Sequence, residues 1–152
     1  MFRILLIEDN PVDVMVVREA LREHASDYDV HVINDGSQAL DLLSTLDHGS
    51  NAAGYDLIVL DLHLPKLEGT EILKRLRADD WNPNTPIVVM TAFATPREIE
   101  FLANVYPALF YVEKPKSLVE SAQLGHMIRA ILAGTPPYDV QFDREKVKSN
   151  AC

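Results

Sequence analysis

Several side chains that could carry out chemistry follow directly after short apolar runs of the sequence. They are Glu8 and Asp9 after 3–7, Asp61 after 56–60, Thr91 after 86–90 and Lys114 after 109–113. Carboxylates brought close together repel one another, and a divalent cation with oxygen ligands relieves that repulsion. A carboxylate can also act as a nucleophile and form an aspartyl-phosphate. Because phosphoryl transfer depends on positioning and charge neutralisation, three carboxylates beside a hydroxyl and an ammonium predict phosphorylation of an aspartate.

These side chains meet only if the apolar runs form neighbouring parallel strands. The β-type runs at 3–7, 29–33, 56–60, 86–90 and 109–113 alternate with helical patterns at 11–25, 37–46, 68–78, 96–105 and 118–133. Strand-helix alternation repeated in this way predicts one doubly wound α/β domain with a five-stranded parallel sheet. Ligands of such sheets bind at the carboxyl ends of the strands, which is where the reactive side chains stand.

Three of the expected helices carry start signals. Asn10 can cap the first helix, with Pro11 at its first position. The segments 95–98 (TPRE) and 117–120 (SLVE) have the pattern of capping boxes. These signals place helix starts shortly after the first and fourth apolar runs and after Lys114.

Composition and charge exclude several classes of protein. The net charge of −9, from 23 acidic and 14 basic residues, argues against a nucleic-acid partner. The apolar runs are too short to cross a bilayer and the N-terminus lacks the layout of a signal peptide, so no membrane partner is expected. The single cysteine, Cys152, excludes a disulfide framework and fits a cytoplasmic protein. We expect a domain at 1–133 and a C-terminal extension at 134–152 that is no separate output domain.

Four motifs together resemble the receiver domain of bacterial two-component response regulators. They read LLIEDN, LIVLDLHLPKLEG, VVMTA and FYVEKP, and the resemblance covers about residues 2–133. It implies a flavodoxin-like fold with strand order 2-1-3-4-5, and a phosphoacceptor signalling protein rather than an enzyme. The implied site residues are the phosphoacceptor Asp61, the metal ligands Glu8, Asp9 and Asp61 with the backbone carbonyl of His63, the switch residues Thr91 and Tyr111, and the phosphate-contacting Lys114. The implied metal is Mg²⁺ or Mn²⁺, on which self-phosphorylation and slow autodephosphorylation would depend.

The resemblance also gives roles to side chains beside the acceptor. No second His or Cys lies at metal-ligand spacing from His63, so a zinc site is not expected. His63 and Phe93 instead occupy positions that, in this family, influence how fast the acyl-phosphate hydrolyses. Since Phe93 could exclude attacking water, we expect a long-lived phosphorylated form. The Lys114–Pro115 bond would be cis in this family, although X-Pro bonds are usually trans.

One kind of receiver fits best. Because no helix-turn-helix segment follows residue 133, we expect a stand-alone regulator that signals by protein-protein contacts. The 46–55 connection, DLHLPKLEG and the extension are similar to regulators paired with bacterial phytochrome histidine kinases, so a sensor histidine kinase of this type is the expected partner. We also expect a homodimer through the fourth helix, fifth strand and fifth helix. Its exposed apolar patch would comprise Phe101, Tyr106, Leu109 and Phe110, the alternative being ordinary core packing.

Two other functions would use the same acids. A phosphohydrolase of the haloacid-dehalogenase type also has an aspartyl nucleophile, but it needs a second Asp where this chain has His63. A pseudo-receiver would be a binding module that is never phosphorylated, but such modules typically lack part of the acid set or the lysine. Nucleotide binding is disfavoured, because the sequence has neither a Walker loop nor a G-x-G-x-x-G motif.

Overall fold

The computed structural model describes residues 1–45, 54–78, 85–105 and 109–135. Within these residues, parallel strands form one five-stranded sheet in the order β2-β1-β3-β4-β5. The strands are β1 (Phe2–Ile7), β2 (Tyr28–Ile33), β3 (Leu57–Leu60), β4 (Ile87–Thr91) and β5 (Leu109–Glu113). The α-helices are α1 (Pro11–Ala20), α2 (Gly36–Thr45), α3 (Gly69–Ala78), α4 (Pro96–Val105) and α5 (Leu118–Leu132). The predicted doubly wound fold and its strand order are confirmed.

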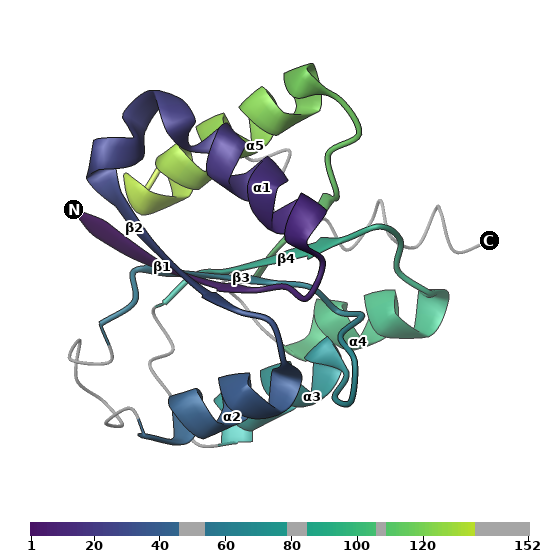
Figure 1. The fold of residues 1–152 in the computed structure, drawn as a ribbon. Coiled ribbons are helices and arrows are strands. Elements are labelled where there is room, and N and C mark those ends of the chain that lie inside the picture. Colours follow the sequence, from purple (N-terminus) through teal and green to yellow (C-terminus); the bar gives the residue numbers. More distant parts are fainter. Residues whose placement is uncertain (46–53, 79–84, 106–108, 136–152) are drawn as a thin grey trace.

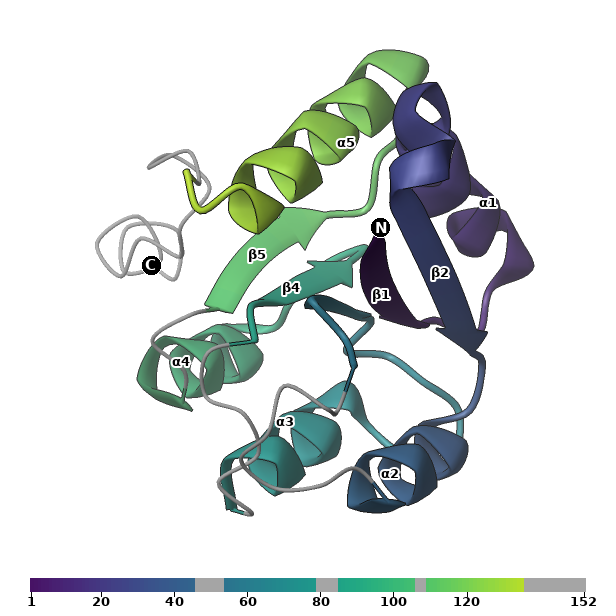
Figure 2. The same ribbon diagram turned by 90° about the vertical axis from the view of Figure 1, so that its left-hand side faces the viewer.

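Helices cover both faces of the sheet. α1 and α5 lie on one face, and α2, α3 and α4 lie on the other (Figure 1, Figure 2). Successive side chains of a strand point to opposite faces. β1 therefore places Ile4 and Leu6 in the core beside α1 and α5, and Leu5 and Ile7 in the core beside α2 and α3. Burial on both faces explains why the central strands are continuous apolar runs.

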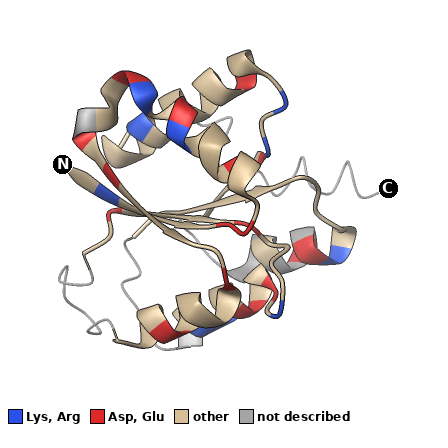
Figure 3. Cartoon of the chain, in the orientation of Figure 1, with Lys and Arg blue, Asp and Glu red and all other residues tan. Residues whose placement is uncertain are grey.

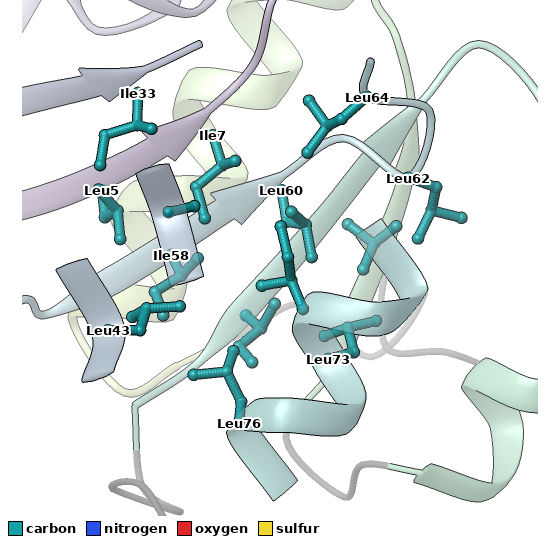
Figure 4. Packing of buried hydrophobic residues seen from close by; sticks show 14 of the residues in the cluster. Leu5, Ile7, Ile33, Leu43, Ile58, Leu60, Leu62, Leu64, Leu73 and Leu76 are labelled. Atoms are coloured by element: carbon teal, nitrogen blue, oxygen red, sulfur yellow. The ribbon is translucent and has the colours of Figure 1, made fainter. Parts of the chain in front are cut away.

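The core beside α3 anchors the chain on both sides of Asp61. Figure 4 shows Leu60 at the end of β3, Leu62 in the loop that follows, and Leu73 of α3 in the same cluster. All three leucines are fully buried. Since full burial of a leucine side chain contributes roughly 1.5–3 kcal/mol, the leucines on either side of Asp61 hold its backbone firmly.

The capping boxes predicted for α4 and α5 form, with one difference. At α4 the Thr95 hydroxyl accepts from the N–H of Glu98 at 3.2 Å, and the Glu98 carboxylate accepts from the N–H of Thr95 at 2.7 Å. At α5 the Ser117 hydroxyl accepts from the N–H of Glu120 at 3.1 Å. The Glu120 carboxylate, however, accepts from the N–H of Lys116 at 2.7 Å and thereby caps the residue before Ser117.

α1 begins as predicted but ends earlier than residue 25. The side chain of Asn10 accepts from a backbone N–H two residues further on, at 2.9 Å. The helix ends at Ala20, and the 3-10 helix η1 (Arg22–Asp27) follows, with His24 in a non-helical conformation at φ −128° and ψ 34°. A Cβ on Gly125 of α5 would lie 2.1 Å from the carbonyl oxygen of Ala20. The end of α1 is thus in backbone contact with α5, a packing constraint that periodicity does not report.

The prediction of an exposed apolar patch on β5 is wrong for the two residues that can be assessed there. Leu109 is 2% exposed and Phe110 is 6% exposed. β5 is an edge strand of the described sheet, but Leu109 packs in the core beside α3 and Phe110 in the core beside α5. Two-sided helix coverage therefore accounts for the apolar run. Tyr106 lies outside the described residues, and of Phe101 only the backbone in α4 is described.

Two other expectations fall mostly outside the described residues. Residues 46–53 of the predicted 46–55 connection are not described, and neither are residues 136–152 of the expected extension. Among the helices that are described, none is long and apolar enough to cross a membrane.

Candidate functional site

The carboxyl ends of the strands bring the predicted reactive residues to one edge of the sheet. Figure 3 shows acidic residues on loops that leave this edge. The N–H groups of Glu8 and Asp61 each donate to a carbonyl of a neighbouring strand at 3.0 Å, and the N–H of Lys114 donates to the carbonyl of Thr91 at 2.9 Å. Sheet hydrogen bonding thus continues past the strands and fixes the backbone of the reactive residues.

The Lys114 ammonium lies at the centre of a cluster of carboxylates. Its Nζ is 2.7 Å from Oδ2 of Asp13, 2.9 Å from Oδ2 of Asp61 and 3.2 Å from Oε2 of Glu8. Partial burial disfavours the charged ammonium, but hydrogen bonds to Asp13 and Asp61 and the nearby negative charges outweigh this effect and raise the pKa of Lys114. Lys114 is therefore positively charged at neutral pH and neutralises part of the charge around Asp61.

Asp13 is the residue of this cluster that the sequence analysis missed. It stands in the first turn of α1, where an acidic residue is common because it interacts favourably with the helix dipole. Its side chain is 19% exposed and makes the shortest of the three contacts with Lys114. The sequence offered one signal: Asp13 is an acidic residue in the first turn of the helix that follows Glu8-Asp9.

Glu8 is a buried carboxylate with incomplete hydrogen bonding. Its side chain is 0% exposed, and Oε1 accepts from the N–H of Asn10 at 3.1 Å. Oε2 lies within ion-pair distance of Lys114 but without hydrogen-bond geometry, so this buried oxygen lacks a hydrogen-bond donor. Desolvation, which outweighs the Asn10 hydrogen bond, together with the charge of Asp61, raises the pKa of Glu8 to about 7. A further positive charge would favour its ionised form.

The acids fit a divalent cation. Glu8, Asp9 and Asp61 each offer a carboxylate oxygen, and these atoms lie within 4.8 Å of one another. Asp9 is exposed, whereas Glu8 and Asp61 are buried, so the set opens to solvent on one side. Hard oxygen ligands of this kind suit Mg²⁺ or Mn²⁺. Oε2 of Glu8, which is buried without a hydrogen-bond donor, gives the same indication.

On the other side of Asp61, two side chains share one acceptor. The Thr91 hydroxyl donates to the Phe93 carbonyl at 3.2 Å, and His63 Nε2 lies 3.1 Å from the same oxygen. In the tautomer with hydrogen on Nε2, His63 donates to it as well. The rings of His63 and Phe93 stack, with centroids 5.4 Å apart. Both residues predicted to influence hydrolysis thus lie together beside Thr91.

The loop after β3 holds the backbone of Asp61 closely against α3. The N–H of His63 donates to Oδ1 of Asp61 at 3.1 Å, and the N–H of Gly69 donates to the carbonyl of Leu62 at 2.8 Å. A Cβ on Gly69 would lie 2.4 Å from the carbonyl oxygen of Asp61. Glycine is therefore required at this close approach of two backbones.

Tyr111 and the Lys114–Pro115 bond complete the predicted site. Tyr111 is half-buried in β5, pairs in register with Val89, and packs against the core beside α3. Burial raises the pKa of its hydroxyl, so it is uncharged at neutral pH. Its role as a switch residue stays a prediction. The Lys114–Pro115 bond is trans, so the expectation of a cis bond is wrong for this structure.

Comparison with known families identifies one match over most of the chain. The sequence profile of the response regulator receiver domain matches residues 4–124. The chain is 34% identical over 88 residues to response regulator Rcp1 of Synechocystis sp., a segment that covers 58% of this chain and 60% of Rcp1. It is 33% identical over 91 residues to the polar-differentiation response regulator DivK of Brucella anthropi, which covers 60% of this chain and 67% of DivK.

Solved structures agree with the sequence comparisons. The phosphorylated cyanobacterial phytochrome response regulator RcpA superposes with a TM-score of 0.75 and 29% identity, over 90% of this chain and 96% of RcpA. The Mn²⁺-bound form of Rcp1 superposes with a TM-score of 0.73 and 26% identity, over 90% of this chain and 98% of Rcp1. The residues that match the family, 4–124, include the candidate site from Glu8 to Lys114.

Proposed function

Because the chain belongs to the response regulator receiver domain family, we propose that Asp61 accepts a phosphoryl group from a sensor histidine kinase. The observation that carries this proposal is the setting of its carboxylate. Oδ2 accepts from the Lys114 ammonium at 2.9 Å and Oδ1 from the N–H of His63 at 3.1 Å. The carboxylate is therefore oriented at the edge of the sheet where ligands of doubly wound folds bind. The protein would signal through contacts with other proteins.

In the proposed reaction, a carboxylate oxygen of Asp61 attacks the phosphorus atom of a phosphohistidine. A P–O bond to Asp61 forms as the P–N bond breaks, and the electron pair of the broken bond stays on the imidazole. Such a transfer needs little acid-base chemistry but much charge neutralisation. Lys114 supplies one fixed positive charge within 2.9 Å of Asp61 and needs no rearrangement to do so.

Glu8, Asp9 and Asp61 would hold Mg²⁺ or Mn²⁺, and the backbone carbonyl of His63 is a further proposed ligand. The ion, when bound, would neutralise charge on the phosphoryl oxygens. Oε2 of Glu8, a buried oxygen without a hydrogen-bond donor, supports this assignment. The similarity to Rcp1, whose structure is a Mn²⁺-bound form, supports it as well. In this arrangement Glu8 and Asp9 bind the ion and Lys114 orients the acceptor.

Thr91 would report the phosphorylation to the surface. Its hydroxyl donates to the Phe93 carbonyl at 3.2 Å. To donate to a phosphoryl oxygen on Asp61 instead, it must give up that bond and move. Tyr111, half-buried on the neighbouring strand, would then change its side-chain conformation. The readout would be a change on the surface formed by α4 and β5.

The similarity to RcpA, a phytochrome response regulator, supports a phytochrome-type kinase as the partner. We also propose a homodimer through α4, β5 and α5, because β5 forms an edge of the described sheet. Light scattering at micromolar concentration, with and without a phosphoryl donor, tests the dimer. A monomer under both conditions would refute it without affecting the assignment of Asp61.

Intact-mass analysis after incubation with acetyl phosphate and Mg²⁺ tests the proposed function. The wild-type chain should gain the mass of one phosphoryl group, and Asp61→Asn should gain none. Chelation of the metal should prevent the gain in the wild type. An unchanged wild-type mass with several donors would overturn the proposal in favour of a pseudo-receiver, and turnover of a small phosphate ester would favour a phosphohydrolase.

A further inference from the structure

A second group of metal-ligating side chains lies beside the phosphoacceptor, on the side away from Lys114. It comprises His63 in the loop after β3, Glu68 just before α3, and Glu98 in the first turn of α4. One ligand atom from each of the three lies within 4.8 Å of the other two. Three separate segments of the chain thus present an imidazole and two carboxylates to one point.

The orientation of these groups is set by contacts within the protein. One oxygen of Glu98, Oε2, accepts from the N–H of Thr95 at 2.7 Å and caps α4. This leaves the other oxygen, Oε1, facing His63 Nε2 at 3.8 Å. The imidazole is held by stacking on the ring of Phe93, with centroids 5.4 Å apart. The side chains of His63 and Glu98 therefore need little reorganisation to bind a common ion.

We propose that His63, Glu68 and Glu98 form a binding site for a transition-metal dication such as Zn²⁺. One imidazole with two carboxylates is a ligand set that Zn²⁺ and Co²⁺ accept readily, whereas Mg²⁺ prefers oxygen alone. The donor set thus differs in kind from the all-oxygen set around Asp61.

Solvent reaches this point from the space between α3 and α4. A cavity of about 430 Å³ there is lined by Glu68 and Glu98 and also by the basic residues Lys74 and Arg97. The side chain of His63 is 37% exposed and that of Glu98 is 16% exposed. An ion can therefore enter directly, and water can complete its coordination. The sequence has no second His or Cys at metal-ligand spacing from His63, so the further ligands proposed here are two carboxylates from other segments.

Metal binding here would act on the switch hydroxyl. A His63 Nε2 that binds a metal ion cannot at the same time donate to the Phe93 carbonyl. That carbonyl then keeps the Thr91 hydroxyl as its donor, at 3.2 Å. This consequence rests on the proposed function of Thr91, whereas the metal site itself does not.

Titration with Zn²⁺ by calorimetry, and with Co²⁺ by visible absorption, tests the site directly. Both are done in excess Mg²⁺, which occupies the acids around Asp61, and with Cys152→Ser so that the single thiol does not bind the probe metal. We expect one equivalent to bind, with the absorption bands of a nitrogen-ligated Co²⁺ ion. Glu98→Gln should weaken binding by about tenfold or more, and His63→Ala should also remove those bands.

Matched variants keep the test decisive. Glu98→Gln can still cap α4, because glutamine also serves in a capping box, so an unchanged unfolding midpoint confirms the fold. His24→Ala removes another exposed histidine, 3.9 Å from a carboxylate of Asp27, and should leave binding unchanged. Asp61→Asn should leave it unchanged as well. Equal affinity in Glu98→Gln and the wild type, loss of binding in Asp61→Asn, or no binding by the wild type would each overturn the proposal.

Discussion

The two sides of Asp61 differ in burial and in how their charges are held. Toward α1, Glu8, Asp13 and Lys114 are buried or nearly so, and contacts of 2.7–3.2 Å join Lys114 to the carboxylates. Toward α4, Phe93 is 64% exposed and His63 is 37% exposed, and His63 reaches the largely buried Glu98 only at 3.8 Å. Charges removed from water need close partners, whereas exposed ones can exchange partners at little cost. The side toward α1 is therefore suited to a fixed arrangement of charges, and the side toward α4 is suited to a change of interaction partners.

Removal of the Lys114 ammonium should have the largest effect on the side of Asp61 toward α1. In Lys114→Gln the nearby carboxylates lose their shared partner, and we expect the rate of phosphorylation by acetyl phosphate to fall about 100-fold. The free energy of unfolding without metal should fall by about 3 kcal/mol. A mass time course and urea unfolding measure the two effects. Lys66→Gln, which removes an exposed ion pair with Asp35, is the control and should change neither.

The buried carboxylate of Glu8 should make metal-free stability depend on pH. Its folded pKa is raised from an ordinary 4.5 to about 7, so the folded state retains a proton that the unfolded chain releases. This contribution is full below pH 4.5 and is lost as the pH rises through 7. Relative to Glu8→Gln, the wild type should therefore lose on the order of 2–3 kcal/mol over that range. Unfolding of both proteins in a chelator measures this, and parallel pH curves would contradict it.

Asp13 separates ammonium positioning from metal binding. Asp13→Asn removes the charge 2.7 Å from Lys114, and we expect a loss of about 1–2 kcal/mol in the free energy of unfolding. Affinity for Mg²⁺ should change little. Asp9→Asn, at an exposed residue, should show the reverse: weaker metal binding with an unfolding free energy close to that of the wild type. Equal effects of both variants on metal binding would show that Asp13 belongs to the metal site.

The smallest of the expected effects concerns Phe93, on the side of Asp61 toward α4. Because the Phe93 ring stacks on His63 beside the acceptor, Phe93→Ala should admit water and shorten the half-life of the phosphorylated form several-fold. The amount of phosphorylated protein left after removal of the donor, followed over time, measures this. Leu118→Ala, which alters an apolar side chain that is 81% exposed on α5, is the control. A half-life that is short in the wild type and unchanged in Phe93→Ala would contradict the role of Phe93.

The parts of the fold that follow from local pattern could be predicted. The apolar runs, the caps at Asn10 and Thr95, and the rule that parallel strands end at one edge were sufficient to assemble Glu8, Asp61, Thr91 and Lys114. The metal-ligand atoms of Glu8, Asp9 and Asp61 then fall within 4.8 Å because β1 and β3 are neighbours. No knowledge of side-chain contacts was needed for that step.

What could not be predicted depends on contacts between distant segments. Asp13 is 101 positions from Lys114, and its place in the first turn of α1 is equally explained by the helix dipole, so the sequence alone did not distinguish it as a partner of the lysine. For the apolar residues of β5 the sequence left open an exposed patch or ordinary core packing, and the burial of Leu109 and Phe110 decides for core packing at these two positions. α1 ends at Ala20, which lies against Gly125 of another helix, and helical periodicity reports neither feature.

The close contact at Gly69 limits how the start of α3 and the backbone of Asp61 can move relative to each other. A Cβ there would lie 2.4 Å from the carbonyl oxygen of Asp61 and 2.7 Å from Cα of Leu62, so the start of α3 already touches the backbone of the acceptor. The backbone of Asp61 therefore cannot move closer to the start of α3. Any side chain in place of Gly69 would collide with the carbonyl oxygen of Asp61, so the start of α3 would have to shift away from the loop that follows β3.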